Sequence, residues 1–307
     1  MHMEHTTQYF LGGNTAEGFY SLYGGFCPPE HGDFLWVIKG GPGCGKSSFM
    51  RRIGAAMEQD GLEVEYVLCS GDPDSLDGVY IPALRTGYVD GTAPHVQEAA
   101  YPGAAGLYLD LGQFYDRAAL QKKRDEILAL NAQYKTLYHE AYRLLSACPL
   151  PDPGDAGEPL PQLPPCSGKP GRLDRRFLRA VSCKGLVSVP DVRCRRVREL
   201  HSPAALCRLA DAAQNAGYDV VCAQHPVFPQ LCESVRIAAL DTVYFTSLAA
   251  VDAACAQVLR EACAKLAEAK ALHDKLEAVY NPHVDFDGVY ALAQTHIGML
   301  RKQNSAL

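Results

Sequence analysis

The chain has 307 residues, of which 48% are apolar, and a net charge of −6. This length leaves room for two domains, and this composition is that of a globular protein, which excludes disorder of the whole chain. The negative charge disfavours a nucleic-acid partner. No uncharged apolar run of about eighteen residues is present, so we expect no membrane partner. The polar start Met-His-Met-Glu-His does not resemble a signal peptide, and we expect a cytoplasmic location.

Twelve cysteines are scattered along the chain without a C-x-x-C pair. At this size and in this compartment we expect reduced thiols, with neither a disulfide framework nor a zinc site. One of them, Cys44, lies inside the motif described next. A redox switch is one interpretation of Cys44, and a small apolar filler is the one that we favour.

The first predicted strand, residues 34 to 39, runs directly into the sequence Gly-Gly-Pro-Gly-Cys-Gly-Lys-Ser-Ser. This G-x-x-x-x-G-K-S pattern is typical of a loop that binds nucleotide phosphates. Its glycines let the backbone wrap around a phosphate, with successive amides pointing inward. Lys46 would contact the β- and γ-phosphates, and Ser47 would ligate Mg²⁺. The expected binding residues are Gly40, Gly41, Pro42, Gly43, Cys44, Gly45, Lys46, Ser47 and Ser48.

An amphipathic helix is predicted at residues 46 to 58, and a strand at 63 to 69. The segment Ser70 to Asp77 follows that strand and carries three carboxylates. It would lie at the carboxyl edge of the sheet, where ligands bind in α/β folds. One carboxylate there could activate water or hold a metal, and we select Asp72 as the catalytic candidate. Ordinary turn chemistry is the alternative explanation.

Two further strands are predicted near residues 79 to 83 and 86 to 90. A phosphate-loop enzyme needs an acid at the end of a neighbouring strand to hold Mg²⁺. Asp90 is our choice for this catalytic and metal-binding role, and Asp110, at the end of Leu-Tyr-Leu-Asp, is the alternative. The lone His95 is expected to be structural.

A long helix is predicted from about residue 116 to 147, followed by a proline-rich connector that holds eight of the twenty prolines. Another helix is predicted from 251 to 280. Asn281-Pro282 ends it, and Asp285 or Asp287 would cap a last helix through Leu300. These features predict a nucleotide-binding domain at 1–148, a linker at 149–171 and a second domain at 172–307.

The second half repeats the first. A shift of 156 residues gives nine identities in 28 ungapped positions, between 61–88 and 217–244, where roughly two are expected by chance. The repeat predicts strands near 219 to 224 and 235 to 246. Lys46 falls on Ser202 and Asp90 on Thr246, so the second copy is degenerate and lacks its phosphate loop. The expected fold is α/β, a duplicated phosphate-loop NTPase-like parallel sheet with added long helices.

The segment from Lys169 to Arg208 contains eleven Lys or Arg and three acids, so its charge is +8 and that of the remainder is −14. A solvated basic face is one interpretation, and a site for an anionic or protein partner is the other. Four arginines of this segment could supply a cation to the γ-phosphate across the interface between the halves: Arg193, Arg195, Arg196 and Arg198.

Four stretches together resemble a bacterial family of tandem P-loop proteins that are described only as ATPases. They are Tyr-Phe-Leu-Gly-Gly-Asn-Thr-Ala-Glu-Gly-Phe (9 to 19), the phosphate loop, Asp-Pro-Asp-Ser-Leu-Asp-Gly-Val (72 to 79) and Val-Asp-Gly-Thr-Ala-Pro-His (89 to 95). The resemblance implies a P-loop NTPase fold in each half and ATP as the nucleotide. It also implies a second GKS or GKT, which this chain lacks.

These observations predict a protein that binds ATP and Mg²⁺ and hydrolyses ATP at one site. Two alternatives remain open. In a small-molecule kinase, the loop from Asp72 to Asp77 would hold an acceptor hydroxyl. In a noncatalytic scaffold that senses nucleotide, Mg-ATP would bind without turnover.

Overall fold

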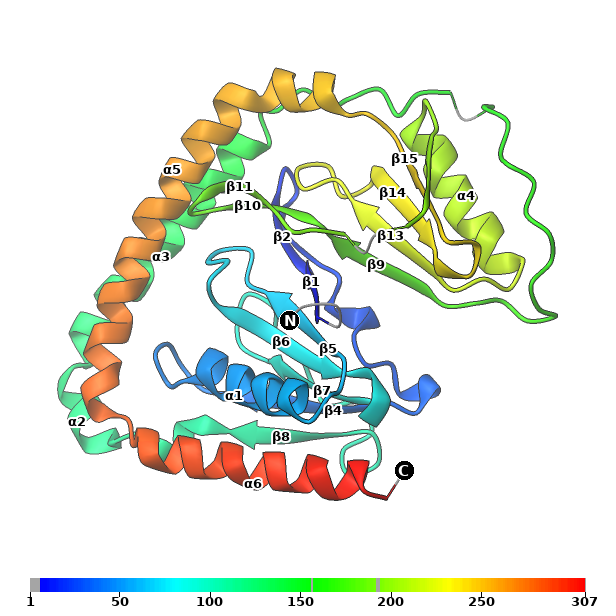
Figure 1. Ribbon diagram of the computed structural model, residues 1–307. Coiled ribbons are helices and arrows are strands. Elements are labelled where there is room, and N and C mark those ends of the chain that lie inside the picture. Colours follow the sequence, from blue (N-terminus) through cyan, green and yellow to red (C-terminus); the bar gives the residue numbers. More distant parts are fainter. Residues whose placement is uncertain (1–5, 156, 192–193, 307) are drawn as a thin grey trace.

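The computed structural model describes residues 6–155, 157–191 and 194–306. Its centre is one eleven-stranded sheet that passes through both halves of the chain (Figure 1). The strand order is β12-β15-β14-β13-β9-β1-β5-β6-β7-β4-β8. The predicted α/β class is therefore confirmed, and most of the paired residues of this sheet lie in parallel ladders. Within the described residues, none of the helices is both long and apolar enough to cross a membrane.

The first half contributes β1 (Thr6–Phe10), β4 (Phe34–Lys39), β5 (Val64–Leu68), β6 (Leu76–Ile81), β7 (Thr86–Asp90) and β8 (Gly106–Asp110). Strand β4 pairs in parallel with β7 on one side and with β8 on the other. Among the strands of this half, the exception to the predicted parallel sheet is β6, which is antiparallel to both β5 and β7. The connections on either side of β6 are too short for the crossover that parallel strands need.

The strands of the second half are β9 (Leu173–Phe177), β12 (Arg196–Glu199), β13 (Val220–Gln224), β14 (Cys232–Ile237) and β15 (Thr242–Phe245). The region predicted as one strand at 235 to 246 is a pair of antiparallel strands, β14 and β15. The halves meet where Phe10 of β1 pairs with Phe177 of β9. Each half also has a small hairpin, β2 (Gly12–Thr15) with β3 (Gly18–Ser21), and β10 (Arg179–Ser182) with β11 (Gly185–Ser188).

Helix α1 (Lys46–Gln59) covers the sheet of the first half, and α4 (Pro203–Asn215) covers that of the second. The apolar stripe of α1 predicts its orientation correctly, because Phe49, Met50, Ile53 and Met57 are all fully buried. Burial of such a stripe against a sheet is the main source of stability for a helix of this length.

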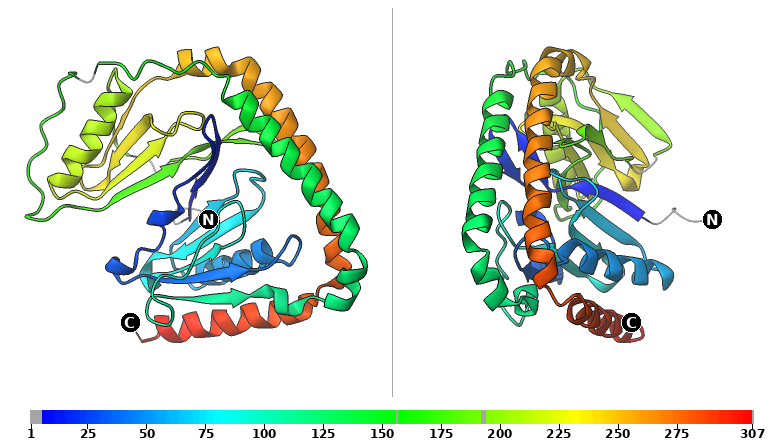
Figure 2. Two further views of the ribbon diagram at one scale, coloured as in Figure 1. Left: turned by 180° about the vertical axis from the view of Figure 1, so that it is seen from behind. Right: turned by 90° about the vertical axis from the view of Figure 1, so that its left-hand side faces the viewer.

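The long helices form an antiparallel pair that spans both halves (Figures 1 and 2). The predicted helix at 116 to 147 is broken at Lys123 into α2 (Arg117–Lys122) and α3 (Arg124–Leu145), and α3 packs along α5 (Ala249–Tyr280). Asp285 caps α6 (Phe286–Asn304) by accepting from the amide of Gly288 at 3.0 Å.

Helix α6 returns to the first half, where it packs on α1. Its buried side chains Val289, Ala293, Ile297 and Leu300 belong to the same core as those of α1. The C-terminal part of the predicted second domain therefore completes the core of the first half.

The described residues of the proline-rich segment form neither helix nor strand, and the segment is anchored to the second half. The amide of Cys166 donates to Ala216 O at 2.7 Å, and the amide of Gly171 donates to Gln214 O at 2.8 Å. Leu160 and Leu163 pack against the core beneath α4. The segment is a strap along α4 instead of a free connector.

Candidate functional site

The turn between β4 and α1 is the glycine-rich segment predicted to bind phosphate. Gly43 and Gly45 adopt φ angles of 67° and 88°, a region that residues with a side chain rarely enter. This turn lets α1 begin at Lys46 immediately after the loop. The first amides of a helix have no partner within the helix, so they are donors available to an anion.

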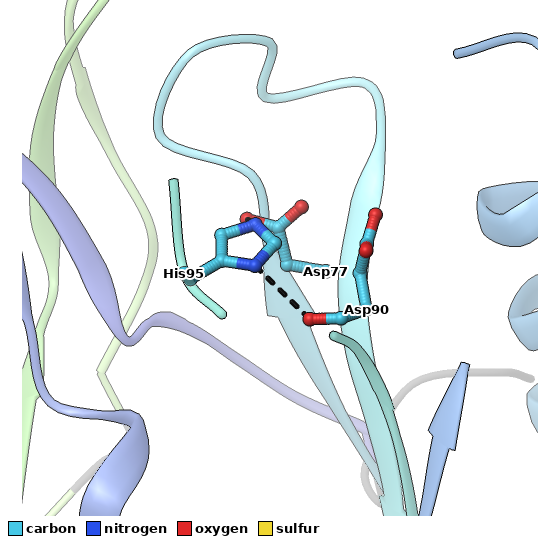
Figure 3. A group of neighbouring side chains, drawn as sticks. All are labelled: Asp77, Asp90 and His95. Atoms are coloured by element: carbon cyan, nitrogen blue, oxygen red, sulfur yellow. Dashed lines mark hydrogen bonds and ion pairs between the residues drawn. The ribbon is translucent and has the colours of Figure 1, made fainter. Parts of the chain in front are cut away.

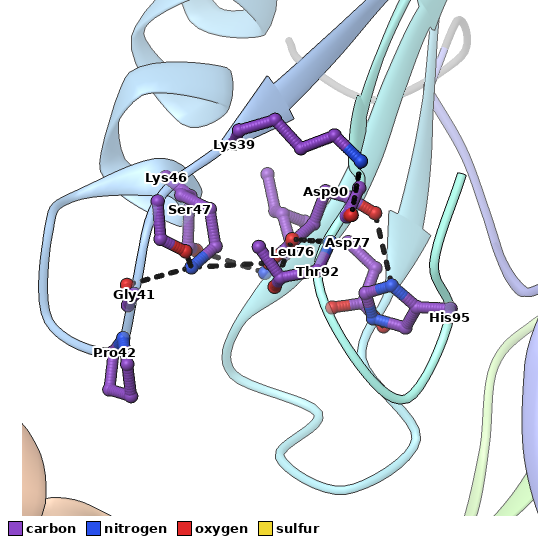
Figure 4. A network of polar contacts seen from close by, with 12 residues as sticks. Lys39, Gly41, Pro42, Lys46, Ser47, Leu76, Asp77, Asp90, Thr92 and His95 are labelled. Atoms are coloured by element: carbon purple, nitrogen blue, oxygen red, sulfur yellow. Dashed lines mark hydrogen bonds and ion pairs between the residues drawn. The ribbon is translucent and has the colours of Figure 1, made fainter. Parts of the chain in front are cut away.

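Lys46 lies between the loop and the neighbouring strand β7 (Figure 4). Its Nζ donates to Gly40 O and Gly41 O at 2.9 Å each, and it lies 3.6 Å from Oδ2 of Asp90. Both side chains are only 12% exposed. Burial lowers the pKa of Lys46, but the nearby acidic groups, the Asp90 carboxylate foremost, together more than offset this and hold the pKa above its usual value. Lys46 is therefore a fixed cation at the site.

Ser47 and Cys44 occupy different environments in the same loop. The Oγ of Ser47 accepts from the amide of Leu76 at 2.9 Å, which leaves a second lone pair for a metal. Cys44 is buried, and burial raises the pKa of its thiol. A buried neutral thiol is a poor nucleophile, so the burial of Cys44 agrees with its interpretation as a small apolar filler.

Asp90 is oriented by the turn that follows β7. Its Oδ1 accepts from the amide and the hydroxyl of Thr92, at 2.9 and 2.5 Å, while Oδ2 faces Lys46. Asp110, the alternative acid, is exposed and uses Oδ1 to accept from the amide of Gly112 at 2.7 Å, capping the 3-10 helix η4 (Leu111–Phe114). The structure thus brings Asp90, and not Asp110, to Lys46.

Asp77, which the sequence analysis did not select, and His95, which it expected to be structural, form a buried polar cluster with Asp90 (Figure 3). The His95 ring bridges the two strands, because Nδ1 lies 3.0 Å from the backbone oxygen of Asp90 and Nε2 lies 3.3 Å from Oδ2 of Asp77. Tyr23 also donates to Oδ2 of Asp77, at 3.0 Å. Lys39 holds the loop that carries His95, by donating to Gly91 O at 2.9 Å and Gln97 O at 2.7 Å.

His95 is an imidazolium at neutral pH. Burial lowers its pKa, but the Asp77 carboxylate, together with that of Asp90, outweighs burial and raises the pKa to about 9. Both ring nitrogens then donate, so neither has a lone pair for a metal. The cluster balances two carboxylates with two cations, Lys46 and His95. The carboxylates are accordingly its candidate metal ligands, and His95 is a positioning group.

Asp72, the catalytic candidate, lies in the turn before β6. It accepts from the hydroxyl of Ser75 at 2.9 Å and forms an ion pair with Lys270 of α5 at 3.4 Å. These contacts are those of a turn residue tied to a helix. Among the carboxylates of this segment, it is Asp77 that lies beside Asp90.

The end of α5 and the following 3-10 helix η6 (Asn281–His283) pack against the phosphate loop. The side-chain amide of Asn281 donates to Gly43 O at 2.9 Å. A Cβ at Gly43 would lie 3.2 Å from the backbone of Glu277. Near the same place, the rings of Tyr134 on α3 and His273 on α5 are in edge contact, with centroids 5.7 Å apart. The α3–α5 pair therefore forms one wall of the site.

The proposed arginine from the basic segment cannot reach this site. Strand β12, which carries Arg196 and Arg198, is at the opposite end of the sheet from β4. Nine strand spacings separate them, on the order of 40 Å. Arg195 directly precedes β12 and is paired with Asp241, and Arg193 lies outside the described residues. The expectation of a cation supplied across the interface is wrong for this sheet order.

Much of the remaining basic segment is neutralised within the protein. Arg179 forms ion pairs with Glu233 and with Asp252, the latter at 2.8 Å. Arg175 pairs with Asp211, which lies outside the segment, at 3.8 Å. These pairs account for part of the +8 charge without an external partner.

Comparisons with family models, with curated proteins and with solved structures find no match to this chain. The resemblance to tandem P-loop proteins accordingly rests on the sequence motifs alone.

Proposed function

We propose that the protein binds Mg-ATP at the loop of residues 40–48 and hydrolyses it at this single site. The observation that carries the proposal is the position of Lys46. It starts a helix directly after a left-handed glycine turn, and its ammonium lies 3.6 Å from a buried carboxylate at the end of the adjacent strand. A phosphate-loop NTPase needs this pairing of a phosphate-binding lysine with a strand-end acid.

The residues present suit a magnesium ion and a triphosphate. Ser47 and Asp90 offer hard oxygen ligands from neighbouring elements, which is the donor set that Mg²⁺ prefers. When bound, the ion would neutralise charge on the phosphates. Lys46 would orient the same oxygens. Asp77 and His95 would hold Asp90 in place, since the His95 ring contacts both strands. We propose Asp77 in place of Asp72 as the second carboxylate of the site.

We also propose that the two halves are a tandem duplication of a P-loop-like unit. In support, β9-β13-β14-β15-β12 repeats the pairing of β1-β5-β6-β7-β4, with parallel and antiparallel ladders in the same places. Local details repeat too. Arg85 and Asp241, 156 residues apart, adopt φ angles of 46° and 48° after equivalent 3-10 turns.

The direct test measures Mg-ATP binding by calorimetry and phosphate release by the same preparation. Lys46→Ala should abolish both, and Ser47→Ala should remove the dependence on Mg²⁺. Lys135→Ala, an exposed lysine on α3, is the matched control and should behave as wild type. Equal binding by Lys46→Ala and wild type would refute the proposal.

Two contacts favour the scaffold as the second candidate. Asn281 with Gly43, and Lys270 with Asp72, connect the phosphate loop and the neighbouring turn to α5, which runs along both halves. Nucleotide binding without turnover under any condition would support this function. ADP release that requires an added metabolite would instead support the kinase.

A further inference from the structure

A hollow of about 440 Å³ lies where η4, α2 and the start of α3 meet the end of α5. Its walls include the rings of Tyr115 and Tyr280 and the apolar side chains of Ile127 and Leu128. Gln121 and Arg124 add polar groups. A mostly apolar hollow with aromatic walls and a few polar groups is the usual form of a small-molecule site.

The hollow adjoins the phosphate loop. The hydroxyl of Tyr115 donates to Pro42 O at 3.4 Å. A Cβ at Gly41 would lie 2.9 Å from the Tyr115 hydroxyl and 3.8 Å from the Tyr280 ring. Both rings that line the hollow therefore also touch the first part of the loop. Burial raises the pKa of both phenols, so the rings are neutral.

The sheet order shows on which side of the phosphate loop the hollow lies. Asp90, at the end of β7, pairs with Ile38 on one side of β4, and Asp110, at the end of β8, pairs with Lys39 on the other. Lys46 and Asp90 mark the β7 side, where the γ-phosphate and Mg²⁺ are proposed to bind. The hollow begins directly after β8, on the opposite side. A triphosphate lying along the loop from Lys46 would direct its nucleoside end toward the hollow.

Helix α3 connects the two places. Tyr134 lies close enough to Lys46 for the charge of that lysine to act on the pKa of its phenol. Ile127 precedes Tyr134 by seven residues, so both lie on the same face of α3, about 10 Å apart. The phosphate loop and the hollow thus both lie along the same face of α3.

We propose that this hollow binds the purine base of the nucleotide. The inference rests on the proposed function and assigns the base subsite of the same site. The base would stack on the tyrosine rings, whose centroids are 5.4 Å apart and tilted by 46°. Gln121 offers an amide donor and acceptor to the edge of the base. A purine presents a larger face to these rings than a pyrimidine does, so ATP and GTP should bind more tightly than CTP and UTP.

Calorimetry with ATP, GTP, CTP, UTP and inorganic tripolyphosphate tests this assignment. Loss of stacking in Tyr280→Ala should weaken ATP binding roughly 10- to 100-fold and leave tripolyphosphate binding within about twofold. Leu128→Trp, at a side chain that is 48% exposed, should fill the hollow with the same outcome and without disturbing the core. Tyr101→Ala, an exposed tyrosine that does not line the hollow, is the matched control. Photolabelling with 8-azido-ATP should modify the peptide spanning 115–128 or Tyr280.

The outcomes separate the two proposals. If wild type binds ATP through Lys46 but neither variant changes the preference for ATP over tripolyphosphate, the base subsite is refuted and the nucleotide site stands. Equal affinity for purine and pyrimidine nucleotides, or labelling elsewhere, also refutes it. If wild type binds neither ATP nor tripolyphosphate, both proposals fail.

Discussion

Replacing His95 with glutamine should change how the stability of the protein depends on pH. His95 is 6% exposed and bridges Asp77 and the backbone of Asp90. A rise of its pKa from 6.5 to about 9 on folding corresponds to ~3 kcal/mol of stabilisation of the folded state. Because the folded pKa lies above the unfolded one, this stabilisation is fully present below about pH 6.5. It is lost as the pH rises toward 9.

Urea unfolding between pH 6 and 9.5, in reducing buffer with chelator, measures this effect. The difference in unfolding free energy between wild type and His95→Gln should be largest near pH 6 and shrink by ~3 kcal/mol by pH 9.5. Titration of buried thiols contributes equally to both proteins and cancels. His139→Gln, an exposed histidine on α3, should follow the wild-type curve. A difference that stays constant across this range would refute the assignment of His95 as a buried cation.

Three further predictions concern folding. Burial and the Arg179 charge lower the pKa of His225 to about 4, so wild type should lose stability as the pH falls from about 6.5 to 4. The variant His225→Asn can still accept from the amides of Val227 and Phe228, and it should reduce that loss in acid unfolding curves. Phe49→Ala removes a fully buried ring packed on Tyr88 and His296 and should lower the free energy of unfolding in urea by about 3–5 kcal/mol. A decrease smaller than that caused by Leu150→Ala, at an exposed leucine, would contradict this packing. Gly43→Ala should destabilise the protein more than Gly61→Ala does, because both glycines have positive φ but, of the two, only Gly43 has other atoms close to the position of an added Cβ. Equal decreases in melting temperature would argue against the contact between Gly43 and α5.

The sequence predicts those parts of the site that are local in the chain. Each of three features is set by residues that are its near neighbours in the chain: the loop, the start of α1 at Lys46 and the end of β7 at Asp90. The structure has all three at the predicted positions. The apolar stripe of α1 is similarly local. Such features are set by glycine conformation and helical periodicity, which a single sequence reveals.

Contacts between residues that are distant in the sequence could not be predicted in this way. Asp77 meets Asp90 because the antiparallel register that pairs Gly78 with Val89 puts these residues opposite each other. The expected parallel sheet concealed this register, although the short turn at Pro82 was a signal for a hairpin. The contact of Asn281 with Gly43 joins positions more than two hundred residues apart, and helical periodicity alone does not indicate which surface a helix covers.

A single nucleotide per chain is the remaining prediction, and it follows from how the two helix starts are satisfied. Helix α1 follows Gly45, and within the described residues no side chain caps it. Helix α4 begins with Pro203, which has no amide hydrogen. The next two amides are already used, because Ala204 donates to Pro153 O at 3.1 Å and Ala205 donates to Ser202 Oγ at 3.2 Å.

The proline-rich strap thus covers the start of α4, the helix that corresponds to α1 in the proposed duplication. Glu158 adds a carboxylate there, which accepts from the amide of His201 at 3.0 Å and would repel phosphate. Titration of the protein with Mg-ATP should therefore saturate at one equivalent, and Lys46→Ala should remove all of the binding heat. A second equivalent that survives in Lys46→Ala would show that the start of α4 accepts a nucleotide despite its own carbonyl and carboxylate partners.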